Sequence, residues 1–247
     1  MIKSAISLKG FDVRSASPME YLADERALLK QRVEKTAIEM SQNSNFNKWS
    51  EGAVFKDPNG TPTVFWHWTD RSFDRFRTNH GEASYYAFGA HLGSFESATA
   101  RSRTREPNVS PLSKAAHVDR MIPLVIKAKS PLLMSEPRTG RWGVDDVMLQ
   151  IFEMAERGEI AISDDLIDEY AQDRLIIRGE DWFDVNLHAQ AEMLKHFLTH
   201  TLHVDCIVYE NQFEKGGNSI LVWDPFLIKS AIANKGTFNA LSSNIYD

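Results

Sequence analysis

Residues 205–238 read DCIVYENQFEKGGNSILVWDPFLIKSAIANKGTF and contain two short apolar runs rich in β-branched side chains. The runs at 206–209 and 219–223 have the length and composition of buried strands. Asp224-Pro225 closes the second run, because proline lacks the N–H that a strand ladder needs. Gly216-Gly217 lies between the runs. We therefore predict two strands joined by a tight, glycine-bearing turn.

Glu214 lies in this turn, beside glycine-containing backbone that can approach a ligand closely. The stretch alone allows two interpretations. Most carboxylates in hairpin loops are solvated surface groups, which is the simpler interpretation. The other is a carboxylate that acts on a bound ligand, and motifs elsewhere in the chain favour it.

The same stretch resembles the C-terminal segment of the ADP-ribosyltransferase-like domains found in polyvalent, phage-associated bacterial proteins. Those domains carry a tyrosine, an asparagine and then a glutamate, followed by a strand that ends in Asp-Pro. An Ile-Lys-Ser and a Gly-Thr-Phe come after that strand. The chain has these features in the same order, at Tyr209, Asn211, Glu214, Asp224-Pro225, Ile228-Lys229-Ser230 and Gly236-Thr237-Phe238.

His67 lies in PTVFWHWT, residues 62–69, a run whose aromatic and β-branched composition predicts a strand. A histidine among apolar neighbours is more often a satisfied core residue than a catalytic one. The family, however, places His-(Gly or aromatic)-(Thr or Ser) at this strand end, followed by Phe-x-x-Phe. His67-Trp68-Thr69 and FDRF, residues 73–76, match both features. We therefore favour a functional His67.

His91 lies in GAHLGS, residues 89–94, where we predict a strand at 85–92 and a helix from about 95 to 103. Ser94 is the expected N-cap of that helix. The family shows Gly-x-His-Phe-Gly-(Thr or Ser), then an alanine and an arginine within the following helix. Ala98 and Arg101 match, while Leu92 replaces the phenylalanine and cannot make its aromatic contacts.

The resemblance covers about residues 62–238 and implies an α+β fold. Its core would be ADP-ribosyltransferase-like, with two small, roughly perpendicular β-sheets, flanking helices and a helical insertion at about 143–203. NAD would bind between the sheets, as in diphtheria toxin and the poly(ADP-ribose) polymerases. Residues 1–48 would be an N-terminal helical arm and 49–247 the catalytic domain.

The resemblance implies the catalytic residues Glu214, His67 and His91. Cleavage of the nicotinamide–ribose bond develops an oxocarbenium-like cation, which the Glu214 carboxylate would stabilise through the ribose 2′-hydroxyl. His67 would hydrogen-bond the adenosine-side ribose, and the backbone of Trp68 would hold the nicotinamide amide. His91 stands where related enzymes have a tyrosine that stacks on nicotinamide. The implied NAD-binding residues are His67, Trp68, Thr69, His91 and Ser94.

The implied activity is mono-ADP-ribosylation of a macromolecular acceptor, protein or nucleic acid, by a toxin-like or phage-related effector. NAD would be a substrate, and no metal is expected. Two alternatives remain open: an NAD glycohydrolase that uses water as the acceptor, and a non-catalytic binding module on the same fold. The N-terminal arm could pack on the catalytic body or hold a partner such as an antitoxin.

Composition agrees with a globular domain, at 43% hydrophobic and 25% charged residues in 247. A net charge of −6 provides no basic footprint for nonspecific nucleic-acid binding, and we expect Arg101, Arg103 and Arg105 to form a solvated rim. The single cysteine suits a reducing compartment. With no membrane-spanning run and no secretory signal in residues 1–12, we expect a cytoplasmic protein, or one delivered into a host or target cell without a signal peptide.

The remaining elements follow from helix and strand patterns. SPME, residues 17–20, is a capping box that should begin a helix reaching about Met40, with a break at 43–47. We predict a strand at 121–128, ended by 129–132, and helices at 143–157, 164–172 and 185–202. His196, His200 and His203 share a face of the last helix, but no H-E-x-x-H pattern or cysteine accompanies them, so we expect no metal site.

Overall fold

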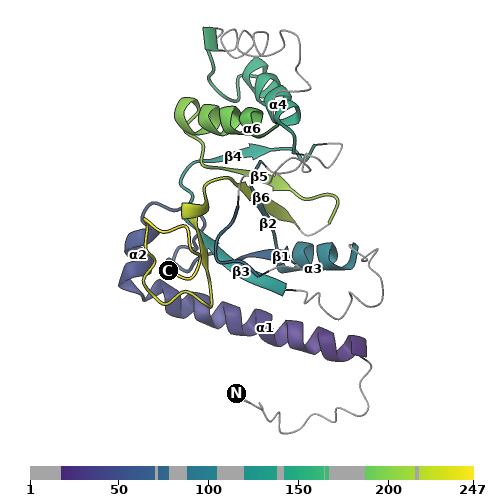
Figure 1. Cartoon of the computed structure of the whole chain (residues 1–247), viewed down its shortest axis with the longest axis vertical. Helices are drawn as coiled ribbons and strands as arrows, with labels where there is room; N and C mark the ends of the chain where they lie inside the picture. The colour runs from purple at the N-terminus through teal and green to yellow at the C-terminus, as the bar shows by residue number, and fades with distance from the viewer. Residues whose placement is uncertain are drawn as a thin grey trace.

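Two small β-sheets and several helices make up the part of the chain that the structure, a computed structural model, describes (Figure 1). This part comprises residues 18–69, 72–77, 88–104, 120–137, 142–163, 165–166, 187–214 and 217–247. The predicted α+β class is confirmed at this level. The predicted helix at 164–172 and the start of the strand at 85–92 lie largely outside the described residues.

The first sheet has three antiparallel strands in the order β1-β3-β7. They are β1 (Phe65–Thr69), β3 (Arg120–Ile126) and β7 (Ile228–Ser230). β1 begins three residues later than the predicted 62–69, because Pro62 pairs only with Lys56, in an isolated bridge.

The second sheet has four strands in the order β2-β6-β5-β4, namely β2 (Ala90–Leu92), β6 (Asn218–Val222), β5 (Cys206–Glu210) and β4 (Pro131–Met134). The predicted pair β5 and β6 is confirmed and is antiparallel, with Ile207 opposite Leu221. β4 corrects the prediction that 129–132 merely ends a strand, since it runs parallel to β5. Pro131 is tolerated because it is the first residue of an edge strand.

Gly93 joins the two sheets. Its N–H and C=O exchange hydrogen bonds with the backbone of Trp66, at 3.0 and 2.8 Å. A Cβ at this position would lie 2.8 Å from Ser219 Oγ and 3.0 Å from Ser97 Cβ, so only glycine fits. This close approach places β1 beside β2.

The core forms three apolar clusters between successive layers of helices and sheets. Figure 1 shows these layers stacked from top to bottom. Helices α4 (Val144–Glu156) and α6 (Leu187–His196) cover the four-stranded sheet. The second cluster fills the space between the sheets and includes Leu92, Leu124 and Ile220. α6 continues as a π-helix, Phe197–Thr201, which completes the predicted helix at 185–202.

The N-terminal helices pack on the outer face of the three-stranded sheet. α1 (Pro18–Ser41) and α2 (Ser44–Trp49) bury Val33, Phe46 and Trp49 in the third cluster. The predicted break after α1 is a helix start, because Asn43 Oδ1 accepts the N–H groups of two α2 residues. The arm therefore packs on the sheet that carries His67.

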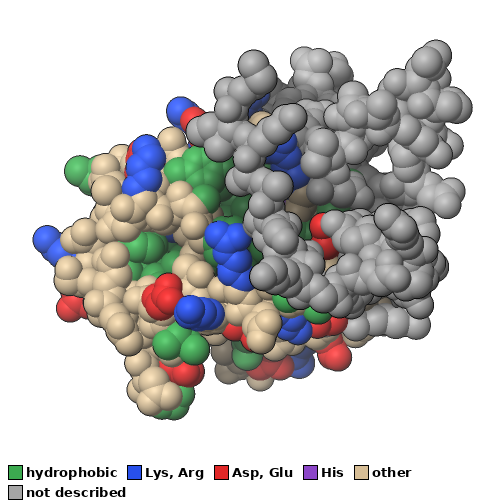
Figure 2. Space-filling view, turned by 90° about the horizontal axis from the view of Figure 1, so that it is seen from below, with side chains coloured by type: hydrophobic (Ala, Val, Ile, Leu, Met, Phe, Trp, Pro, Cys, Tyr) green, Lys and Arg blue, Asp and Glu red, His purple; other side chains and the backbone are tan. Residues whose placement is uncertain are grey.

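The surface on the α1 side carries charges of both signs. Figure 2 shows blue and red side chains interspersed there among the residues drawn in colour. Lys30 and Glu96 form one such pair, at 2.9 Å, and join α1 to α3 (Phe95–Thr104). None of the described helices combines the length and apolar character that a membrane span requires.

Candidate active site

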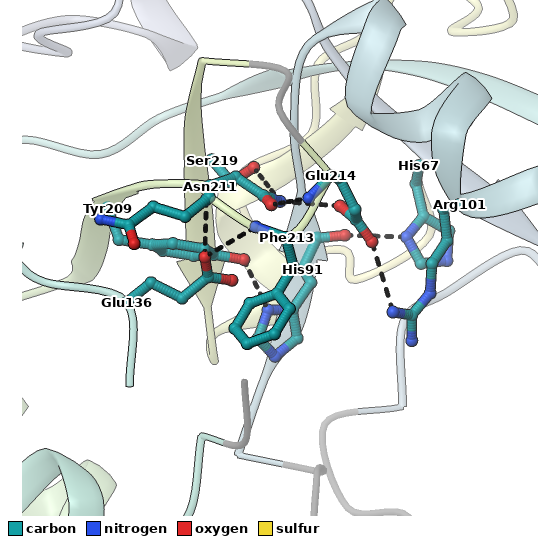
Figure 3. Close-up of polar contacts among 10 residues, drawn as sticks. His67, His91, Arg101, Glu136, Tyr209, Asn211, Phe213, Glu214 and Ser219 are labelled. Carbon is teal, nitrogen blue, oxygen red and sulfur yellow. Dashed lines mark hydrogen bonds and ion pairs between the residues drawn. The ribbon is translucent and has the colours of Figure 1, made fainter. Parts of the chain in front are cut away.

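His67 and His91 meet where β1 and β2 adjoin. His67 Nδ1 lies 3.0 Å from the backbone oxygen of His91 (Figure 3). Because a carbonyl only accepts, Nδ1 of His67 carries a hydrogen. Phe73 and Phe76 contact the His67 ring edge-on, at centroid distances of 6.0 and 5.0 Å. The Phe-x-x-Phe motif therefore fixes the orientation of this histidine.

His91 is partly buried beside two aromatic side chains. Its Nδ1 lies 3.1 Å from the hydroxyl of Tyr209, and Trp142 packs on Tyr209 at 4.5 Å between centroids. Burial, reinforced by the positive charge of the neighbouring Arg101, lowers the pKa of His91 from 6.5 to about 4. His91 is therefore neutral at pH 7.

Glu214 is held by side chains rather than left in solvent. Its Oε2 accepts a 2.7 Å hydrogen bond from Asn211 Nδ2, and its backbone N–H donates to Asn211 Oδ1 at 2.8 Å. Arg101 Nη1 donates to Oε1 at 3.3 Å. The Glu214 side chain is 20% exposed. Glu214 is therefore more firmly held than a freely solvated loop acid, and its action on a ligand remains a prediction.

Arg101 reaches the site from α3. Its side chain is 57% exposed, which agrees with the predicted solvated rim for this residue, and it also forms an ion pair with Glu214. Arg105 and the side chain of Arg103 lie outside the described residues. The sequence pointed to Arg101 only through its match to the family motif, and that match assigned it no function.

Glu136 supports the loop that carries Glu214. Its Oε2 accepts the backbone N–H groups of Gln212 at 2.6 Å and Phe213 at 3.2 Å. Sequence analysis missed Glu136 because it lies in a distant loop after β4, with no motif around it. Tyr209 and Asn211 were part of the quoted motif, but their contacts could not be read from it.

The secondary candidates occupy the surrounding strand and helix ends. Ser94 Oγ accepts the N–H of Ser97 at 3.0 Å, which confirms Ser94 as the N-terminal cap of α3. Thr69 is buried at the end of β1, and Trp68 is partly buried opposite Met121 in the β1–β3 ladder. Their predicted contacts with NAD remain predictions.

The three helical histidines do not form a cluster. The rings of His196 and His200 lie 4.5 Å apart, but His203 follows the end of the π-helix with a positive φ of 55°. The expectation of one shared helical face for all three is therefore wrong. Within the described ranges, no group of three or more His, Cys, Asp or Glu side chains is placed to hold a metal ion.

Two surface hollows lie away from these residues. One of about 530 Å³ opens between α1 and the turn at 57–62, and one of about 210 Å³ lies between α1, β1 and the start of α3. Neither is lined by His67, His91 or Glu214. We place the candidate site by its chemistry, since a held carboxylate beside a neutral histidine is a more specific feature than a shallow hollow.

No protein-family model, curated protein or solved structure matches the chain. The resemblance to ADP-ribosyltransferase-like domains therefore rests on the motifs quoted above. The function has to be argued from the contacts within the site.

Proposed function

We propose that the protein is a mono-ADP-ribosyltransferase that cleaves the nicotinamide–ribose bond of NAD and transfers ADP-ribose to a macromolecular acceptor, protein or nucleic acid. The observation that carries the proposal is the Glu214 carboxylate, partly open and held by Asn211 and Arg101. Two histidines from adjoining strands are linked to each other, and His91 also contacts Tyr209. The proposal includes an ADP-ribosyltransferase-like core with roughly perpendicular sheets.

The reaction needs one fixed negative charge. Nicotinamide leaves with the electron pair of the broken C–N bond, which leaves positive charge on the ribose C1′ and ring oxygen. The acceptor attacks C1′ and releases its proton to the solvent, so that nicotinamide, one proton and the ADP-ribosylated acceptor are the products. Glu214 accepts a hydrogen bond from the ribose 2′-hydroxyl and stabilises the developing cation, as preorganised charges do. Asn211 prevents the carboxylate from turning away.

His67 is placed to bind rather than to react. Its Nδ1 hydrogen is directed at the carbonyl of His91, so Nε2 of the neutral ring is an acceptor. An acceptor suits a hydroxyl of the adenosine-side ribose. The packing of Phe73 and Phe76 keeps the ring in place without substrate.

The proposal is tested with the full chain and NAD labelled in the adenosine half, with and without a bacterial lysate. We expect nicotinamide release and label on a macromolecule for the wild type, and neither for Glu214→Gln. Glu210→Gln is the matched control, because Glu210 is an exposed carboxylate at the end of β5. Nicotinamide release should be insensitive to EDTA.

The other outcomes assign different functions. Nicotinamide release with free ADP-ribose as the sole product, even with lysate present, identifies an NAD glycohydrolase. NAD binding without release identifies a binding module. Equal loss of activity in Glu214→Gln and Glu210→Gln, or no NAD binding, contradicts the proposed site.

A further inference from the structure

The Glu214 carboxylate and the Arg101 guanidinium form an ion pair at the candidate site, and Figure 3 shows the two side chains directed at one another. They come from the loop before β6 and from α3, 113 residues apart in the chain. We propose that Arg101 changes partners, pairing with Glu214 until NAD binds and then binding the pyrophosphate of the dinucleotide. The inference rests on the proposed function for the identity of the ligand.

The first argument is the net charge of the pair. In the proposed reaction Glu214 stabilises a developing cation, which requires a negative charge that no neighbour cancels. The Arg101 guanidinium, 3.3 Å from Oε1, brings an opposite charge of the same size. It would also repel the nicotinamide ring, which is positively charged in NAD. Arg101 therefore has to pair with another anion during the reaction, and the only anionic group of NAD is its pyrophosphate.

The second argument is which partner of the carboxylate can give way to a ribose hydroxyl. Oε2 accepts from Asn211 at 2.7 Å, and Oε1 accepts from Arg101. Asn211 is only 4% exposed, and it also accepts the backbone N–H of Glu214 at 2.8 Å and donates to Ser219 at 3.0 Å. The Arg101 side chain is 57% exposed. Arg101 is therefore the partner that can leave, and its departure opens Oε1 to the ligand.

The two contacts of Arg101 also differ in strength. The bond to Glu214 is a single one of 3.3 Å from a largely exposed side chain, and exposed ion pairs contribute about fivefold or less to an equilibrium constant. A guanidinium can meet a phosphate through two parallel, charge-assisted N–H···O bonds. Hydrogen bonds to charged groups contribute roughly tenfold to a hundredfold. The exchange of partners therefore favours the bound dinucleotide.

The place of Arg101 suits a phosphate contact. One phosphate of NAD is attached to C5′ of the ribose whose 2′-hydroxyl would bind Glu214, so it lies only a few bonds from that hydroxyl. Besides burial, the positive charge of Arg101 lowers the pKa of His91, so the guanidinium lies close to that ring as well. A long, largely exposed side chain beside both residues is suited to reach the phosphate of the same ribose.

A purely structural role for Arg101 makes a different prediction. If Arg101 only held the Glu214 loop, its loss would act through Glu214 and would have no further effect once Glu214 had lost its charge. If Arg101 binds the pyrophosphate, its loss weakens the ligand whether or not Glu214 is charged. The two roles are therefore separated by measuring ligand affinity in both single variants and in the double variant.

The test measures the Kd of ADP-ribose for the full chain by isothermal titration, because this ligand keeps the pyrophosphate and is not consumed. Arg101→Gln should weaken ADP-ribose roughly tenfold or more and flatten the salt dependence of its Kd. Arg101→Lys keeps the charge and should lose less. Nicotinamide riboside, which lacks phosphate, should bind equally to wild type and Arg101→Gln. Arg157→Gln is the matched control, because Arg157 is 54% exposed and pairs with Glu159, away from the site.

Glu214→Gln breaks the pair from its other side. It should leave the Kd of ADP-ribose unchanged or up to about fivefold tighter, and Arg101→Gln should still weaken the ligand in that background. Equal ADP-ribose affinity of wild type and Arg101→Gln, or no effect of Arg101→Gln beside Glu214→Gln, overturns the inference even if NAD is cleaved. Arg101-dependent binding in a chain that does not cleave NAD supports it and refutes only the proposed reaction. No binding of ADP-ribose or NAD overturns both.

Discussion

Glu214 and Lys229 are charged residues of one sequence motif, yet the structure uses them in opposite ways. Lys229, on β7, is completely buried, and its Nζ donates to the backbone oxygens of Ser242 and Asn244, both at 2.8 Å. Glu214 keeps 20% of its side chain exposed and is held by one exposed and one buried partner. The comparison teaches that a charge satisfied by the backbone serves the fold, whereas a charge held with one edge open is available to a ligand.

The largest expected effect concerns Glu214, the charge in this comparison that is available to a ligand. Glu214→Gln keeps size and hydrogen bonding but removes the charge that the developing cation needs. We expect kcat for nicotinamide release to fall about 100-fold or more, because the lost interaction is stronger in the transition state. NAD affinity should change little, as measured by isothermal titration. The free energy of unfolding should stay within about 1 kcal/mol of wild type.

His67→Ala is the contrasting variant for that experiment. A ribose contact is made in both ground and transition states, so its loss should weaken NAD binding more than it slows turnover. Near wild-type turnover of Glu214→Gln would remove Glu214 from the catalytic role.

The second expected effect concerns Lys229, the charge in this comparison that serves the fold. Lys229→Met leaves the carbonyl oxygens of two partly buried residues without the donor that holds them, and it loosens the C-terminal segment that they belong to. We expect a loss of about 2 to 4 kcal/mol in the free energy of unfolding, measured in urea at pH 7. Lys235→Met is the matched control, since Lys235 is exposed and pairs only loosely with Asp247, at 3.7 Å. Equal stability of the two variants would contradict the role of Lys229.

The lowered pKa of His91 predicts that the free energy of unfolding depends on pH. The change should be as large as the loss expected for Lys229→Met, or slightly smaller. Its pKa is lowered to about 4 in the folded chain, so the unfolded chain binds the proton first as pH falls. The contribution of neutral His91 to the free energy of unfolding is fully present above about pH 6.5. It is lost as pH falls toward 4, by on the order of 2 to 3 kcal/mol. Urea unfolding at pH 7 and pH 4.5 should show this loss in wild type and in His200→Asn. His91→Asn should lose less.

The strands could be predicted from the sequence more completely than the contacts between them. β5 and β6 were predictable because each is a short β-branched run and Asp224-Pro225 ends the second. β4 was not, because Pro131 suggested an end of pairing, while only the sheet order shows that it begins an edge strand.

The same difference holds for the site: residues in local motifs could be predicted, and residues joined by distant contacts could not. Glu214, His67 and His91 could be named from motifs because each motif is local. Glu136 could not, since its bond to the loop spans 76 residues and no residue near it signals the contact. The hydrogen bond from Asn211 to Ser219 was equally hidden, because it depends on which atom of Asn211 faces the Glu214 backbone.

The smallest effect sharpens the comparison at Arg101, which touches Glu214 but is 57% exposed. Exposed ion pairs contribute little, so Arg101→Gln should change the free energy of unfolding by less than about 1 kcal/mol. The same change removes a positive charge near His91, and the pKa of His91 should therefore rise. Lys30→Gln is the control: Lys30, 43% exposed and on α1, pairs with Glu96 of α3, and its removal should leave the pKa of His91 unchanged. A ¹⁵N-histidine titration of both variants measures the difference. If Arg101→Gln instead destabilised the chain as strongly as Lys229→Met, exposure would not separate the residues that serve the site from those that serve the fold.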